Sequence, residues 1–542
     1  MTPGAINATL ALAITVDPRN VTDRVGPLMY GSGIETYEHQ MYGGLWSNVV
    51  YDDSLEDAAL GSLATSPRQS WFQRDSNCSI TDKPIAFNGK HSLALGPGCA
   101  ALNRGLVAAP TATSMHWVGG RSYDGYFFWT TAGTTDHQDA GSIDVTLLCA
   151  PVGDISAANA SSVGNVRVTL DPSVPPAAGD WRMVNFTVTA AADCLQGAAA
   201  ASMGFVRVST PPAPKEGIAA SSAVLVDKLM LEPGEWGRYN GLHIRKDLAE
   251  LFLGQRPAVM RLGGSMTNAP GFRFHFMVGP PWSRPPTDSG WIPTTSWGFG
   301  MFEFVQFAEL AGIHPVLCLN FAEDMAGLLE YMYGDPHATQ WGRQRATDGH
   351  PSPYTRNITF ICSNEEPQQD SGGDFARYIT AWTAWIAEFK RSAKRLGVWP
   401  LRVGVAMDSG ASRRFSPGNE DKFSGGSHEM LRAIFAAGLN DTEVVWDQHG
   451  DGGVAAGWGD ENRDWEALLS LPNNNSMEAL SKAGGKWVKT VMLEENGGGC
   501  GLGRALGHVS ISLSLQRIGT LFPIDVRWGQ GGGNRRATGW QV

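Results

Sequence analysis

The chain lacks a long apolar run, and it lacks an excess of positive charge. No segment of its 542 residues approaches the roughly eighteen consecutive apolar residues of a membrane-spanning helix. The formal net charge of -11 and the isoelectric point near 5.6 argue against nucleic acid or membrane as a partner, because both favour a basic face. Residues 1–16 have neither a basic start nor a long apolar core, so no signal peptide is visible.

Motifs of several other classes are missing as well. The seven cysteines include no Cys-x-x-Cys pair, which argues against a zinc ribbon or a thioredoxin-like site. No Gly-x-Ser-x-Gly follows a predicted strand, and no register of residues 497–507 gives Gly-x-Gly-x-x-Gly. His449 has no second His or Cys at ligand spacing, so we expect neither a metal nor another cofactor.

What is present indicates a secreted glycoprotein, extracellular or in the cell wall. Four cysteines fall within the first 200 residues, which predicts one or two disulfides there. The nineteen tryptophans give slight weight to carbohydrate as a partner, because flat aromatic rings suit sugar rings. Asn-x-Ser/Thr sequons are frequent and occur at Asn7, Asn20, Asn77, Asn159, Asn185, Asn357, Asn440 and Asn474.

The predicted secondary structure changes twice along the chain, near residues 59 and 237. Short β-rich runs separated by turn residues fill residues 59–236 and predict an inserted β-sandwich. From 237 to 528 helices alternate with apolar strands, which predicts a parallel sheet covered by helices. Residues 1–58 would supply an N-terminal strand and the first barrel strand, and residues 529–542 a disordered tail.

Helix signals support the alternating region. Residues 241–254 and 300–312 read as helices that end at glycine, and 374–397 keeps a helical apolar period between an Asp and a Gly. Polar residues follow several different strands of this region, which favours a (β/α)8 TIM barrel over a doubly wound sheet. They are Arg261, Asn320, Asn364 with Glu365, Asp447 with His449, and Glu494 with Glu495.

Paired carboxylates at two of these strand ends indicate glycoside hydrolysis. That reaction needs one protonated carboxyl at the leaving oxygen and one ionised carboxylate at the anomeric carbon. Glu365 follows the apolar run 360–362, and Glu494 and Glu495 follow a strand about three αβ units later. In a closed barrel this separation places the two strand ends across the mouth from each other.

Five segments, in this order, resemble the α-L-arabinofuranosidases of glycoside hydrolase family 51. They are "LMYGSGIETYEHQMYGGLW", "MRLGGSMTNAPGFRFHFMVGP", "GHPSPYTRNITFICSNEE", "VVWDQH" and "VMLEENGG". The resemblance spans roughly residues 10–520, and the 59–236 block resembles the carbohydrate-binding module inserted in plant-type members. It implies a retaining enzyme with glutamates at the ends of barrel strands 4 and 7, acting on arabinose-containing polysaccharide or oligosaccharide.

Carried over residue by residue, the resemblance assigns Glu365 as the acid/base and Asn364 as its sugar-binding neighbour. Glu494 is the favoured nucleophile, with Glu495 as the alternative. Glu35, Arg261, Asn320 and His449 would line the sugar site.

The chain departs from the family pattern at three places. Arg261 is followed by Leu262-Gly263-Gly264 where the family has an aromatic and Pro-Gly-Gly, and "GDGG" replaces an aromatic-rich segment after His449. After a possible eighth strand in "TLFPIDV", the residues given are not expected to form the C-terminal β-sandwich that is usual in the family. Two alternatives therefore stay open: a carbohydrate-binding protein with an inactive or truncated barrel, or a related barrel glycosidase of other sugar specificity. The sequence does not indicate the oligomeric state.

Overall fold

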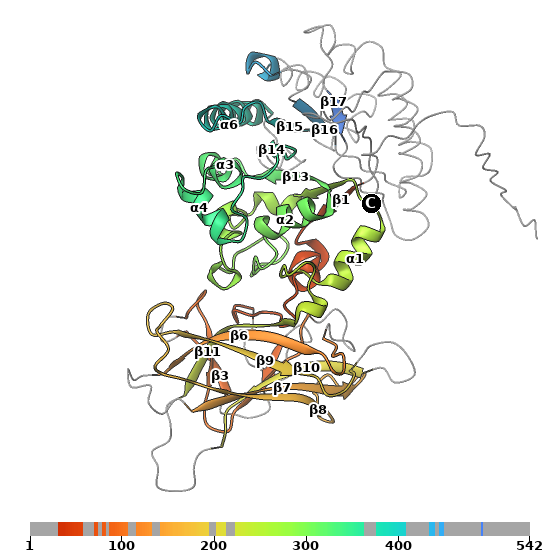
Figure 1. Ribbon diagram of the computed structural model, residues 1–542, viewed down its shortest axis with the longest axis vertical. Helices are drawn as coiled ribbons and strands as arrows, with labels where there is room; N and C mark the ends of the chain where they lie inside the picture. Colours follow the sequence, from red (N-terminus) through yellow and green to blue (C-terminus); the bar gives the residue numbers. More distant parts are fainter. Residues whose placement is uncertain are drawn as a thin grey trace, which may run out of the picture.

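The structure is a computed structural model. It describes residues 31–57, 70–73, 78–82, 86–106, 115–132, 141–194, 202–212, 223–362, 375–407, 433–439, 444–448 and 489–491. These residues form an α/β part and a part built of antiparallel strands, which lie one above the other in Figure 1.

The α/β part is built on a seven-stranded parallel sheet whose spatial order follows the chain. Its strands are β1 (Gly31–Ile34), β12 (Val259–Leu262), β13 (His314–Leu319), β14 (Thr359–Cys362), β15 (Arg402–Met407), β16 (Val444–Gln448) and β17 (Lys489–Val491). Each strand pairs in parallel with the next, beginning with Gly31 opposite Val259. Sequential parallel order is the topology of a (β/α)8 barrel. Within the described residues β1 and β17 are the two edges, and no closed barrel is seen.

Helices follow most of these strands. The α-helices are α1 (Lys246–Gly254), α2 (Met301–Ala311), α3 (Met325–Tyr333), α4 (Gln340–Thr347) and α6 (Phe375–Arg395). The short helices are η1 (Tyr37–His39), η2 (Met41–Leu45), η3 (Glu235–Gly237), η4 (Ser265–Asn268), η5 (Phe274–Phe276) and η6 (Pro281–Ser283). Helix α2 ends where Gly312 takes a φ of 67°, a left-handed conformation that glycine adopts at low cost. No helix among the described residues is both long enough and apolar enough to cross a membrane.

The two faces of the parallel sheet differ. Alternate residues such as Leu262, Leu319 and Cys362 pack into the large hydrophobic core beneath the helices. The residues between them, including Arg261, Cys318 and Ile361, point to the opposite face and are also buried. Burial on both faces explains the nearly continuous apolar runs of these strands.

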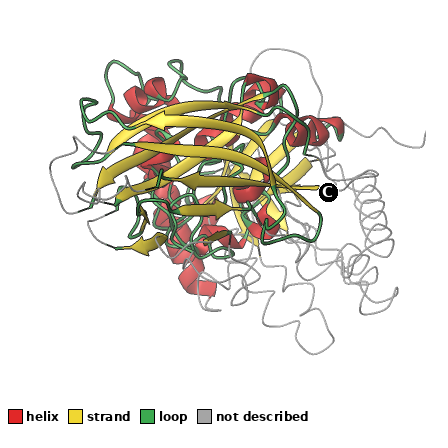
Figure 2. Cartoon of the chain, turned by 90° about the horizontal axis from the view of Figure 1, so that it is seen from below, coloured by secondary structure: helices red, strands yellow, loops and turns green. Residues whose placement is uncertain are grey.

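The segment between β1 and β12 contains two five-stranded antiparallel sheets. One has the order β2 (Trp71–Gln73), β5 (Ala100–Asn103), β10 (Ser202–Ser209), β7 (Ser142–Pro151) and β8 (Ser161–Thr169). The other has the order β3 (Cys78–Thr81), β4 (Ser92–Leu95), β11 (Val224–Pro233), β6 (Ser122–Thr131) and β9 (Arg182–Thr189). The two sheets enclose one hydrophobic core, and their long strands are seen from the sandwich end in Figure 2.

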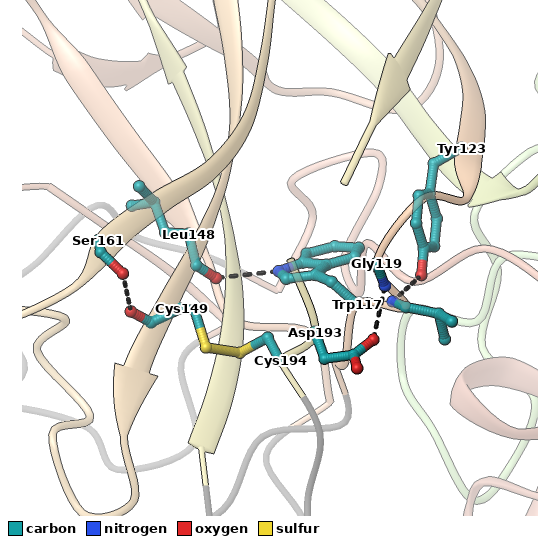
Figure 3. The surroundings of a disulfide bond; sticks show 9 residues. Trp117, Gly119, Tyr123, Leu148, Cys149, Ser161, Asp193 and Cys194 are labelled. Atoms are coloured by element: carbon teal, nitrogen blue, oxygen red, sulfur yellow. Dashed lines mark hydrogen bonds between the residues drawn. A yellow bond between two sulfur atoms is a disulfide. The ribbon is translucent and has the colours of Figure 1, made fainter. Parts of the chain in front are cut away.

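Two disulfides lie in this β-sandwich, each with one cysteine on a strand, which confirms that the early cysteines pair. Cys78 joins Cys99, and Cys149 joins Cys194. Beside the second bond the Trp117 indole N–H donates to the Leu148 carbonyl over 2.9 Å (Figure 3). The Trp117 ring also meets Tyr123 edge to face at 5.1 Å. Removal of a native disulfide from a small domain typically costs 2–5 kcal/mol, so this pairing stabilises the sandwich.

The sandwich and the α/β part share apolar core. Outward-facing side chains of the second sheet, such as Tyr126, Phe128 and Met230, belong to the same core as the residues beneath the parallel sheet. Phe87 stacks on Phe128 with ring centroids 3.6 Å apart. That face of the sandwich is therefore covered by the α/β part.

Some elements differ from the sequence prediction. The predicted helix 241–254 begins only at Lys246, because Gly241 has a φ of 77° and Ile244 pairs with Trp46 as an isolated β-bridge. Helices α3 and α4, between β13 and β14, were not predicted. The predicted N-terminal strand, the eighth barrel strand and the 529–542 tail lie outside the described residues.

Candidate active site

Glu35 and Arg261 meet at the carboxyl ends of the first two parallel strands. Glu35 directly follows β1, and Arg261 lies on β12 opposite Gly33. The Arg261 Nη2 donates to Glu35 Oε1 over 3.2 Å. The arginine side chain is 1% exposed and the glutamate 14% exposed. The pair thus fixes a carboxylate at the edge where a parallel α/β enzyme binds its ligand.

An exposed aromatic pair adjoins this carboxylate. The Trp291 indole N–H donates to Glu35 Oε2 over 3.0 Å, so the two carboxylate oxygens have different donors. The Tyr37 and Trp291 rings meet edge to face with centroids 4.8 Å apart. They remain 44% and 47% exposed, respectively. Large aromatic side chains held at such exposure are suited to contact an apolar ring face of a ligand.

Two glycines after Arg261 lie where the backbone passes close to other parts of the site. Gly264 has a φ of 98°, and a Cβ on it would lie 2.0 Å from the Glu35 carboxyl group. A Cβ on Gly263 would lie 2.6 Å from Cys318 Sγ. Both positions need glycine because the backbone passes so close to Glu35 and to β13.

Asn320 is the third predicted site residue within the described part. Its side-chain amide makes hydrogen bonds to backbone groups. Its Nδ2 donates to the Thr267 carbonyl over 2.6 Å, and its Oδ1 accepts from the Ala322 N–H over 2.8 Å. The side chain thereby ties the end of β13 to the segment after β12. Glu35, Arg261 and Asn320 are thus gathered on three adjacent strand ends.

Sequence reasoning missed Glu323, a buried carboxyl close to Asn320. Its two oxygens accept from the Phe274 N–H and the Asp324 N–H, each over 3.0 Å. Burial raises the pKa of Glu323 to about 7, although both backbone donors and the nearby Arg273 oppose the shift. The sequence does carry a signal for Glu323. It lies three residues after Asn320, which directly follows the apolar strand β13, so it is close to the predicted site.

The long segment between β12 and α2 is organised by one buried arginine. The Arg284 guanidinium donates to the carbonyls of Gly279, Trp297 and Gly298 and forms a two-point pair with Glu303 over 2.8 Å. Arg284 and Glu303 are 1% and 2% exposed. Glu303 also accepts from the Gly300 N–H at the start of α2. This arrangement positions the segment that carries Trp291.

The remaining predicted site residues lie outside the described residues. They are Asn364, Glu365, His449, Glu494 and Glu495. Glu365 comes three residues after β14, the fourth strand of the sheet, and Glu494 three residues after β17, the seventh. Within the described parts of the chain no group of three or more His, Cys, Asp or Glu side chains is arranged to hold a metal ion.

Enzymes of the α/β-barrel type place their sites at the carboxyl ends of sequential parallel strands, which is where the Glu35–Arg261 pair lies. Comparison with known proteins finds similarity to one kind of glycosidase. Residues 252–398 match the family model of the α-L-arabinofuranosidase 1 domain. An extracellular exo-α-L-arabinofuranosidase of Streptomyces chartreusis is 24% identical over 434 residues, which are 73% of this chain and 47% of the relative. α-L-Arabinofuranosidase 2 of Arabidopsis thaliana is 25% identical over 401 residues, 68% of this chain and 54% of the relative.

A solved structure agrees with these sequence relatives. An arabinose-bound family 51 α-L-arabinofuranosidase superimposes with a TM-score of 0.61 at 14% identity, covering 88% of this chain and 68% of that chain. This likeness indicates a fold of the TIM-barrel type. The chain spans about half the length of the curated relatives that it matches. The chain is thus similar in sequence to named α-L-arabinofuranosidases, and similar in fold to one of glycoside hydrolase family 51.

Proposed function

We propose that the chain is a retaining glycoside hydrolase that releases terminal α-L-arabinofuranosyl residues from arabinose-containing polysaccharides. The observation that carries the proposal is the Glu35–Arg261 pair beside Trp291, at the carboxyl edge of a sheet whose fourth and seventh strands lead to glutamates. The likeness to named α-L-arabinofuranosidases supports the choice of sugar. The extracellular relative supports secretion.

Each side chain receives a role in a double displacement. Glu365 would protonate the leaving oxygen and later activate water, and Asn364 and His449 would hydrogen-bond the sugar. Glu35, with its carboxylate fixed by Arg261 and Trp291, would accept hydrogen bonds from sugar hydroxyls. Trp291 and Tyr37 would contact the leaving group.

The strand register bears on which glutamate is the nucleophile. Ile361 of β14 pairs with Gly404 of β15, which pairs with Val445 of β16. Asp447, two residues further along β16, pairs with Val491 of β17. Because paired residues lie on the same face of a sheet, Val491 belongs to the same face as Ile361. That face also carries Arg261. Counted along the sequence in steps of two, Glu365 shares the alternation of Ile361, and Glu495 rather than Glu494 shares that of Val491. We therefore propose Glu495, the alternative in the sequence prediction, as the nucleophile in place of Glu494.

We extend the proposal to domain organisation. Residues 59–236 would form the inserted sandwich, and residues 237–528 together with the strand at 31–34 a closed (β/α)8 barrel. The carbohydrate-binding role suggested for the sandwich is also a proposal. One face of the sandwich packs on the α/β part, so a ligand would have to use another face.

Hydrolysis of 4-nitrophenyl α-L-arabinofuranoside tests the activity. Wild type should release 4-nitrophenol, and Glu365→Ala should lower kcat/KM by about 10²–10⁴-fold, the usual contribution of a general acid/base. Azide should rescue Glu495→Ala with formation of a glycosyl azide, whereas Glu494→Ala should need no rescue. Product that first appears with inverted anomeric configuration would contradict the retaining mechanism. Tight arabinoxylan binding without turnover would instead support the carbohydrate-binding alternative.

A further inference from the structure

The segment carrying Trp291 forms a hairpin with a closed base. We call residues 284–297 the Trp291 hairpin. The Arg284 side chain bonds to the Trp297 carbonyl, which closes the base. Thr287 and Thr295 exchange two backbone hydrogen bonds of 3.0 and 2.8 Å across the hairpin. Trp291 lies at the tip, where its indole N–H reaches Glu35.

The first leg of the Trp291 hairpin is held by a sandwich residue. Asn88, in the turn before β4, is 7% exposed. Its Nδ2 donates to the Arg284 carbonyl over 2.9 Å and to the Trp282 carbonyl over 2.7 Å. The Asn88 backbone N–H donates in turn to Asp227 Oδ2 on β11. The sandwich thereby holds the start of the hairpin through hydrogen bonds to the Trp282 and Arg284 carbonyls.

The second leg is held by another sandwich residue. Lys228 lies at an irregularity of β11, where the pairing with β6 shifts register and its own φ is 51°. Its fully buried ammonium donates to Ser296 Oγ over 2.8 Å and pairs with Asp53 over 2.7 Å. Such a bulge redirects a side chain away from the regular sheet surface. Here it directs the Lys228 ammonium to the hairpin.

We propose that the inserted sandwich braces the active-site edge, with Asn88 and Lys228 acting as positioning residues that hold the Trp291 hairpin and thereby the Glu35 carboxylate. This inference rests on the proposed function for its kinetic consequence, but its structural part stands on the contacts alone. Both legs of the hairpin are fixed from the sandwich, and the tip is fixed on Glu35. Loss of the Asn88 side chain removes the donor to the buried Arg284 carbonyl and to the part-buried Trp282 carbonyl, which favours displacement of the hairpin.

The experiment compares Asn88→Ala with Asn103→Ala in the full chain. Asn103 is a matched control because it is a fully buried sandwich asparagine whose Nδ2 donates to the Tyr51 carbonyl rather than to the hairpin. Hydrogen–deuterium exchange of peptides covering 284–297 should rise in Asn88→Ala and stay at the wild-type level in Asn103→Ala. If Asn88→Ala fails to fold, Ser296→Ala provides the milder test, since it keeps the Lys228–Asp53 pair.

Kinetics give the second readout. Asn88→Ala should raise KM for the aryl arabinofuranoside by up to about fivefold with kcat nearly unchanged, because displaced side chains bind the sugar less well. In a Trp291→Phe background the same change should have little further effect, since both act through one hydrogen bond to Glu35.

The results separate the two proposals. The proposal that the sandwich holds the hairpin would be overturned by either of two results. One is a wild-type rate of hydrogen–deuterium exchange at 284–297 in Asn88→Ala, and the other is additive effects of Asn88→Ala and Trp291→Phe on kcat/KM. A wild-type chain without arabinofuranosidase activity would contradict the proposed function, and the exchange experiment would still decide whether the sandwich holds the hairpin.

Discussion

The buried carboxyl of Glu323 should make the stability of the chain depend on pH in a defined direction. Burial raises its pKa from 4.5 to about 7 in the folded chain. Between these values the folded chain retains a proton that the unfolded chain has released. The free energy of unfolding therefore falls as the pH rises through this window, and the stabilisation is complete only below the unfolded pKa.

The size of the effect follows from the shift. About 2.5 pH units at 1.36 kcal/mol each give about 3 kcal/mol, without reduction for solvent because Glu323 is buried. Glu323→Gln removes the titration but keeps an oxygen for one of the two backbone donors. We expect the variant to be less stable than wild type at pH 5, by about 1 kcal/mol for the lost hydrogen bond. At pH 8 it should be more stable, because wild type must then bury a carboxylate.

Urea unfolding of both proteins at pH 5 and pH 8 measures this difference. Other groups titrate in the same range, but they are common to both proteins and cancel in the comparison. A stability difference between variant and wild type that is the same at both pH values would refute the reasoning. It would mean that Glu323 titrates alike in the folded and unfolded chain.

Three further predictions concern other residues. Arg284→Met should lower the free energy of unfolding by about 3–5 kcal/mol in urea melts, because the Glu303 carboxylate remains buried without its cation; a loss below about 1 kcal/mol would contradict this. Trp291→Phe should lower kcat/KM for an aryl arabinofuranoside about fivefold, since one half-exposed N–H donor to Glu35 is lost; an unchanged value would show that the bond does not orient the carboxylate. Expression through a eukaryotic secretory pathway should give glycan mass that peptide-N-glycosidase removes, and peptide mapping should find it at the sequons with exposed asparagines; unmodified peptides would exclude glycosylation there. Among the described residues, the sequon asparagines that are exposed are Asn159, Asn185 and Asn357.

The parallel order of the sheet could be predicted because short apolar runs alternate along the sequence with segments that carry helix signals. Helix α2 ends one residue before Gly312, and α6 lies within the predicted 374–397. The antiparallel sheets between β1 and β12 were likewise predicted from turn spacing. Local periodicity and turn chemistry carry this information.

The organisation of the site was less predictable. Glu35 and Arg261 were named as site residues, and the structure joins them although they are 226 positions apart. The Trp291 hairpin escaped prediction because it has neither helical nor strand period. Its shape depends on Arg284, Asn88 and Lys228, whose partners lie on other elements. Long-range hydrogen bonds of this kind leave no pattern in adjacent residues.

The isolated pairing of Trp46 with Ile244 has a consequence for the order of folding. β1 and β12 are neighbours in the sheet, yet more than two hundred residues separate them. Once the sandwich has folded and Trp46 meets Ile244, only residues 35–45 and 245–258, about twenty-five in all, remain between the two strands. Loop-closure entropy falls by about 0.6 kcal/mol per halving of length, so β1–β12 pairing becomes about 2 kcal/mol less costly. The sandwich should therefore fold before the first two barrel strands pair, and a variant that delays its disulfides should delay the barrel as well.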